Sequence, residues 1–124
     1  MSERTILYIE DNEYNRKIVR QLLGRTSYQL VEAVDGESGV ALAQQLVPQL
    51  ILMDVQLPKM SGLDATRALK ADPRTSDIPI IVITSFALSG DREKAAVAGA
   101  DSYLAKPYSP RELLALVRQY LPEA

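Results

Sequence analysis

Several polar and charged residues follow separate short apolar runs of this chain, and their types could support phosphoryl chemistry. Glu10 and Asp11 follow the first run, and Asp54 follows the third. Thr84 closes the fourth run, and Lys106 follows the fifth. Clustered carboxylates raise one another's pKa unless a cation lies among them, and oxygen ligands suit Mg²⁺. A carboxylate can also act as a nucleophile toward phosphorus, while a metal ion and a lysine offset the oxygen charge.

Asp54 is the nucleophile that this pattern favours, because it stands alone at the end of the central run. Glu10 and Asp11 would then hold the metal, directly or through water. Thr84 and Lys106 would hold the phosphoryl group once it is attached.

Each of these residues also has a purely structural interpretation. Asp11 or Asn12 could cap a helix, and Asp54 could be a turn residue. Thr84 could be a β-branched strand residue, and Lys106 an ordinary exposed lysine. The functional interpretation is favoured because all these positions fall at the carboxyl ends of separate predicted strands, where parallel sheets bind ligands.

The apolar runs recur at intervals of roughly 20 to 30 residues and alternate with helix-period segments, the pattern of βα units. The predicted strands are Thr5 to Ile9, Gln29 to Val34, Leu50 to Met53, Ile80 to Thr84 and Ser102 to Ala105. The predicted helices are Asn15 to Leu23, Glu37 to Val47, Leu63 to Lys70, Asp91 to Ala98 and Pro110 to Leu121. Ser109 and Glu112 predict a capping box at the start of the last helix. The expected fold is α/β, a (βα)5 doubly wound, parallel five-stranded sheet of order 2-1-3-4-5 in a flavodoxin-like three-layer sandwich.

The composition excludes several other classes of function. The 124 residues, 47% of them apolar, fit a single domain over residues 1–124. The sequence has no Cys and no His, which excludes thiolate sites, disulfides and histidine-based catalysis. A net charge of -2 gives little support to direct nucleic-acid binding. No apolar run is long enough for a membrane span or a signal peptide, so we expect a cytoplasmic protein with no membrane partner.

The chain resembles the receiver domain of bacterial two-component response regulators over essentially all of its length. The segments that carry this resemblance are Ile6–Asn12, Leu50–Pro58 with Met60–Gly62, Ile83–Phe86 and Gly99–Pro107.

The resemblance implies a role for each residue at the strand ends. Asp54 is the phosphoacceptor, and Glu10 and Asp11 form the acidic pair that places Mg²⁺, together with Asp54 itself and the backbone carbonyl of Gln56. Lys106 contacts the phosphoryl group. Glu10 stands where many members of the family carry Asp, and its longer side chain should still reach a metal through water.

The resemblance also implies a conformational switch. Thr84 is the switch hydroxyl, and Tyr103 is the aromatic residue that turns inward as Thr84 moves toward the phosphoryl oxygens. The peptide bond before Pro107 is expected to be cis. Gln56 and Phe86 flank the path of the attacking water, so Phe86→Ala should change the rate of autodephosphorylation unless Phe86 only packs against the sheet edge.

Two surfaces are expected to contact partner proteins. In related receivers the phosphodonor docks where Tyr14, Asn15 and Ile18 lie in this chain. The output face is expected on the helix Asp91 to Ala98, the strand Ser102 to Ala105 and the last helix.

A basic cluster on the first predicted helix offers an alternative output surface. The cluster consists of Arg16, Lys17 and Arg20. Its structural interpretation, a solvated helix face, is the favoured one.

These observations predict a phosphorylation-dependent signalling switch rather than an enzyme, although the protein would promote its own phosphorylation and dephosphorylation. The phosphodonor would be a histidine kinase, a histidine phosphotransfer protein or a small acyl phosphate, and the output a contact with a downstream protein. We expect a stand-alone receiver without an effector domain, either a monomer or a phosphorylation-dependent dimer. The alternatives are a receiver fragment of a hybrid histidine kinase, a flavin-binding flavodoxin-like module and a pseudo-receiver that does not use phosphate.

Overall fold

The computed structural model describes residues 4–85 and 90–123, which form a five-stranded parallel sheet with strand order β2-β1-β3-β4-β5. The strands are β1 (Thr5–Ile9), β2 (Gln29–Ala33), β3 (Leu50–Asp54), β4 (Ile80–Thr84) and β5 (Ser102–Ala105). The helices are α1 (Glu13–Leu23), α2 (Gly36–Leu46), α3 (Gly62–Ala71), α4 (Asp91–Ala98) and α5 (Pro110–Tyr120). The predicted fold class and strand order are therefore confirmed.

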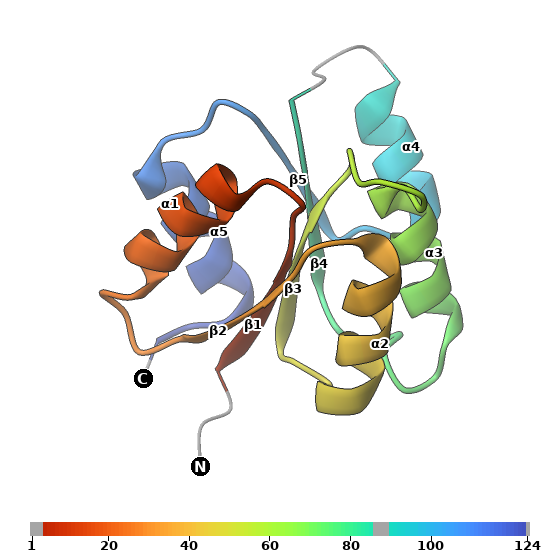
Figure 1. Cartoon of the computed structure of the whole chain (residues 1–124), viewed down its shortest axis with the longest axis horizontal. Coiled ribbons are helices and arrows are strands. Elements are labelled where there is room, and N and C mark those ends of the chain that lie inside the picture. Colours follow the sequence, from red (N-terminus) through yellow and green to blue (C-terminus); the bar gives the residue numbers. More distant parts are fainter. Residues whose placement is uncertain (1–3, 86–89, 124) are drawn as a thin grey trace.

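The sheet lies between two layers of helices. Helices α1 and α5 cover one face, and α2, α3 and α4 cover the other (Figure 1). Strands β3 and β4 are buried at every position, as expected for parallel strands that are covered on both faces. Alternate side chains of each strand enter different cores: Leu52 packs on the side of α1 and α5, and Met53 packs on the side of α2, α3 and α4.

Capping residues set the helix starts. The predicted capping box is present, since the Ser109 hydroxyl accepts a hydrogen bond from the backbone N–H of Glu112 (3.1 Å) and the Glu112 carboxylate accepts one from the Ser109 N–H (2.8 Å). At α1, the side chain of Asn12 accepts from the N–H of Asn15 (2.9 Å), so the helix begins at Glu13 rather than Asn15. The other predicted bounds differ from the structure by no more than one residue, because caps lie outside the apolar pattern.

Within residues 4–85 and 90–123, no helix is long and apolar enough to cross a membrane.

Candidate functional site

Three carboxylates meet at the carboxyl edge of the sheet. Asp54 is the last residue of β3, and Glu10 and Asp11 directly follow the neighbouring strand β1. One carboxylate oxygen from each of these residues lies within 4.8 Å of the other two. Glu10 and Asp54 are buried, with 1% and 3% of their surface exposed, whereas Asp11 is exposed. The strand order thus brings together side chains that are 44 residues apart in the sequence.

Alternation along the strands explains why the buried carboxylates share a face. Tyr8 and Leu52 belong to the core beneath α1 and α5. Side chains two residues apart along a strand point to the same face, so Glu10 shares a face with Tyr8 and Asp54 shares a face with Leu52. Both carboxylates therefore lie on the same face as that core, at the carboxyl edge of the sheet.

The β3–α3 loop folds closely around Asp54. The N–H of Gln56 donates to Asp54 Oδ1 (3.4 Å), and the N–H of Gly62 donates to the carbonyl oxygen of Val55 (2.9 Å). A Cβ atom at Gly62 would lie 2.0 Å from the carbonyl oxygen of Asp54, closer than any real contact. Glycine at the start of α3 therefore allows the helix to approach the backbone that carries Asp54.

Lys106 provides the cation of the cluster. Its Nζ lies 3.1 Å from Glu10 Oε1 and 3.7 Å from Asp54 Oδ1. The backbone N–H of Lys106 donates to the carbonyl oxygen of Thr84 (2.7 Å), and the Lys106–Pro107 peptide bond is cis, as predicted. Lys106 therefore lies closer to Glu10 than to Asp54.

The environment separates the pKa values of the two buried carboxyls. Burial raises the pKa of Asp54, the negative charge of Glu10 raises it further, and the partial compensation by Lys106 leaves it at about 7. Burial also raises the pKa of Glu10, but the hydrogen bond and charge of Lys106 outweigh it, so the pKa lies below its ordinary value. One lysine thus does not neutralise the negative charge of the carboxylates. The remaining charge and the oxygen ligands suit a divalent cation such as Mg²⁺.

A family model for the response regulator receiver domain matches residues 6–118. The chain belongs to this family. It is 37% identical over 121 residues to the polar-differentiation response regulator DivK of Brucella anthropi, and the match covers 98% of each chain. The resemblance seen in the sequence is thereby confirmed.

Solved structures give the same result. The chain is similar to the receiver domain of the sensor histidine kinase PA1611 from Pseudomonas aeruginosa, which has a magnesium ion coordinated in its active site cleft. The TM-score is 0.88 at 35% identity, covering 96% of this chain and 98% of that one. The chemotaxis protein CheY4 of Vibrio cholerae matches with a TM-score of 0.90 at 26% identity, covering 97% and 100%. The comparisons support a phosphoryl-accepting signalling function and do not favour flavin binding.

The two residues of the predicted switch lie on the other face of the receiver's sheet. Thr84 is fully buried at the end of β4, and Tyr103 in β5 packs against the core beneath α4. The Arg92 guanidinium carbon lies 5.2 Å from the centre of the Tyr103 ring, within the range of a cation–π contact. The structure therefore places Tyr103 next to α4, the helix that the switch would affect, while the movement of Thr84 and Tyr103 stays a prediction.

A side-chain contact near Asp54 joins two of the loops. The Ser85 hydroxyl donates to the side-chain oxygen of Gln56 (2.7 Å), which links the end of β4 to the loop after Asp54. Metal binding by the carbonyl of Gln56 stays a prediction. Phe86, predicted to flank the water path, lies outside the described residues.

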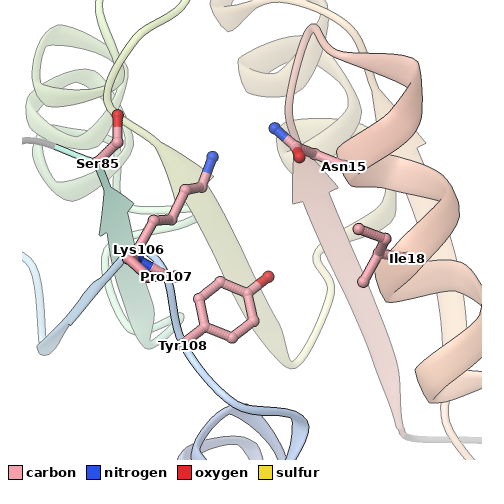
Figure 2. Close-up of a pocket in the computed structure, with 6 residues that line it drawn as sticks. All are labelled: Asn15, Ile18, Ser85, Lys106, Pro107 and Tyr108. Atoms are coloured by element: carbon pink, nitrogen blue, oxygen red, sulfur yellow. The ribbon is translucent and has the colours of Figure 1, made fainter.

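A groove of about 440 Å³ opens beside Lys106. Asn15 and Ile18 of α1 face Lys106, Pro107 and Tyr108 across it (Figure 2). Ile18 is 41% exposed. The predicted docking surface of α1 therefore adjoins Lys106 of the acidic cluster.

Ion pairs occupy two members of the predicted basic cluster on α1. Arg16 Nε lies 3.2 Å from a carboxylate oxygen of Glu32, and Arg20 Nη2 lies 2.6 Å from the same oxygen. Arg16 also donates to the backbone carbonyl of Glu10 (2.9 Å). These contacts favour the structural interpretation of the cluster over an output surface.

Sequence reasoning missed Tyr8. Its ring is fully buried, and its hydroxyl donates to Glu10 Oε1 (3.1 Å). Burial and the charge of Glu10 raise the pKa of Tyr8 far above its ordinary value, so the hydroxyl stays protonated. The sequence did contain a signal: Tyr8 lies two positions before Glu10, and residues two positions apart along a strand point to the same face.

Proposed function

We propose that this receiver accepts one phosphoryl group on Asp54 in a Mg²⁺-dependent reaction and signals through changed contacts with other proteins. The observation that carries the proposal is the geometry at the sheet edge. Oxygens of Glu10, Asp11 and Asp54 lie within 4.8 Å of one another, and Lys106 Nζ lies within 4 Å of two of these carboxylates. An acceptor carboxylate, ligands for a divalent ion and a second cation are thus present at one point.

The chain's residues divide the work of the transfer. The ionised carboxylate of Asp54 attacks phosphorus, so that a new O–P bond forms while the bond to the donor breaks and its electron pair leaves with the donor. Glu10, Asp11, Asp54 and the carbonyl of Gln56 would hold Mg²⁺, which when bound offsets the charge of the phosphoryl oxygens. Lys106 would move from Glu10 toward the phosphoryl group on Asp54 and pair with one of its oxygens.

Phosphorylation then shifts a conformational equilibrium. The phosphoryl group adds negative charge and acceptor oxygens beside Lys106 and the hydroxyl of Thr84. The arrangement in which Thr84 donates to those oxygens is favoured, and Tyr103 turns inward into the space that Thr84 leaves. The surface of α4, β5 and α5 changes as a result and would meet a downstream protein.

The phosphoryl donor must be another molecule, because the chain has no histidine. A histidine kinase or a histidine phosphotransfer protein would dock on α1, where Tyr14 and Ile18 are 71% and 41% exposed. Ile18 lines the groove that leads to Lys106. A small acyl phosphate could enter without docking.

The organisation of the protein is part of the proposal. Since the match covers 98% of the DivK relative, we propose that residues 1–124 act in the cytoplasm as a receiver of the DivK type. The alternative, a receiver belonging to a hybrid kinase, is supported by the similarity to the PA1611 receiver. In either case the receiver is a signalling protein that promotes its own phosphorylation and dephosphorylation, as a monomer or as a dimer formed on phosphorylation.

Intact-mass analysis after incubation with acetyl phosphate and Mg²⁺ tests the acceptor. We expect one phosphoryl group per chain, and no adduct in the Asp54→Asn variant or in the presence of a chelator. An adduct that persists in Asp54→Asn would show a different acceptor residue. If acetyl phosphate gives no adduct, a phosphorylated histidine kinase is offered next, and failure there as well would favour the pseudo-receiver interpretation.

A further inference from the structure

Tyr8 is a buried phenol next to the acceptor site that the proposed function does not use. Its ring is fully buried in the core between the sheet and helices α1 and α5. Its hydroxyl donates to Oε1 of Glu10 at 3.1 Å. Tyr8 lies in the middle of β1, paired on both sides by β2 and β3, so neither its backbone nor its ring can move without disturbing the sheet.

Besides Asp54, three groups donate hydrogen bonds to the carboxylate of Glu10. Tyr8 and Lys106 both donate to Oε1, and the backbone N–H of Asn12 donates to Oε2 (3.2 Å). A glutamate side chain has one more rotatable bond than an aspartate, so more conformations must be restricted before it can hold a metal ion. Lys106 is a flexible donor that would pair with the phosphoryl oxygens once Asp54 is modified. Tyr8 is the side-chain donor that stays in place.

We propose that Tyr8 is a positioning residue, which holds the carboxylate of Glu10 in the orientation that binds Mg²⁺ beside Asp54. The proposal rests on the proposed function, since it requires Mg²⁺ at this acidic cluster. It assigns the Tyr8 hydroxyl a role toward the metal ligand rather than toward the stability of the core. Outer hydrogen bonds of this kind commonly change metal affinity by about 10-fold or more.

The length of Glu10 makes the role of Tyr8 testable by a double-mutant cycle. In Glu10→Asp the carboxylate retracts by about one C–C bond, roughly 1.5 Å. The distance of 3.1 Å to the Tyr8 hydroxyl would then exceed hydrogen-bond range, because the ring cannot follow. Lys106, with its long flexible side chain, can follow the carboxylate. Glu10→Asp therefore uncouples Tyr8 while the site keeps its charge.

The measurement is a Mg²⁺ titration followed by backbone amide chemical shifts, on the wild type, Tyr8→Phe, Glu10→Asp and the double variant. We expect Tyr8→Phe to weaken Mg²⁺ binding about 10-fold in the wild-type background and to have no further effect in the Glu10→Asp background. A matched control is Tyr28→Phe. It removes a hydroxyl from the same core, where the hydroxyl donates to the carbonyl of Leu121, and should leave Mg²⁺ affinity unchanged.

Two results would overturn the inference. One is wild-type Mg²⁺ affinity in Tyr8→Phe, and the other is an equal loss in both Glu10 backgrounds, as a general effect on the core would produce. Thermal unfolding of each variant identifies that second case, because both tyrosine variants would then lose stability to a similar extent. If the wild type binds no Mg²⁺, the proposed function itself fails. If the wild type binds Mg²⁺ and Tyr8 has no effect, only the present inference fails.

Discussion

Replacing Asp54 by Asn should stabilise the metal-free protein in a pH-dependent way. Burial and the charge of Glu10 raise the pKa of Asp54 from 3.8 to about 7. Below pH 4 both the folded and the unfolded states keep the proton, so the raised pKa costs no stability there. Between pH 4 and pH 7 the unfolded chain releases the proton and the folded protein retains it, so stability is lost as pH rises. Asparagine has the shape of the neutral acid and avoids this loss.

The magnitude follows from the same pKa difference. A change from 3.8 to about 7 corresponds to about 4 kcal/mol in the free energy of unfolding, fully expressed above pH 7. The value of about 7 already includes the attraction of Lys106, but asparagine places an amide instead of a carboxyl group beside Lys106 and the backbone N–H of Gln56, which offsets part of the gain. We therefore expect a net stabilisation of about 2–3 kcal/mol at pH 8, or a rise in Tm of about 10 °C, and a much smaller rise at pH 4.

Thermal unfolding of the wild type and Asp54→Asn, in chelator at several pH values between 4 and 8, measures this difference. Added Mg²⁺ is the control, because it stabilises the folded wild type by mass action and should reduce the advantage of a variant that has lost one ligand. A stabilisation that is the same at pH 4 and pH 8 would refute the reasoning, since the effect would then not arise from the charge of Asp54. So would a variant less stable than the wild type at pH 8.

Two further variants test how the site is reached and how it is held. Ile18→Glu places a charge in the groove beside Lys106, so transfer from a phosphorylated protein donor should slow by about 10-fold while the reaction with acetyl phosphate is unchanged; equal transfer rates would remove this docking surface. Gly62→Ala would place a Cβ atom 2.0 Å from the carbonyl oxygen of Asp54, so we expect a loss of about 1–3 kcal/mol in thermal or urea unfolding together with slower phosphorylation. Normal stability and normal phosphorylation of Gly62→Ala would show that the loop can move aside without cost.

The position of the acceptor site was predictable because parallel sheets have a regular geometry. Once Glu10 and Asp54 are placed at the carboxyl ends of neighbouring strands, the distance between strands brings the two carboxylates close together. The position of Thr84 follows in the same way, from the end of β4. Hydrophobic patterning and strand order were sufficient for this part, because the regular backbone of a parallel sheet fixes where the strand ends lie.

The helix starts were less predictable, because single capping residues decide them. Asp11 and Asn12 were equally plausible caps in the sequence, and only the structure shows that Asn12 Oδ1 receives the hydrogen bond. In the same way, Arg16 and Arg20 belong to a basic cluster in the sequence, but in the structure both arginines pair with Glu32 of β2. Such contacts join segments whose relative positions no local pattern specifies.

Long side chains limit prediction most strongly within the site itself. The sequence places Lys106 at a strand end, yet its Nζ can reach any carboxylate within several ångströms, and it lies closer to Glu10 than to Asp54. The closer contact helps to separate the two carboxyls, because Lys106 lowers the pKa of Glu10 while burial and the charge of Glu10 raise the pKa of Asp54 to about 7. In the proposed reaction Mg²⁺ would neutralise Glu10 and the phosphoryl group would add negative charge at Asp54, so we expect Lys106 to be drawn toward Asp54.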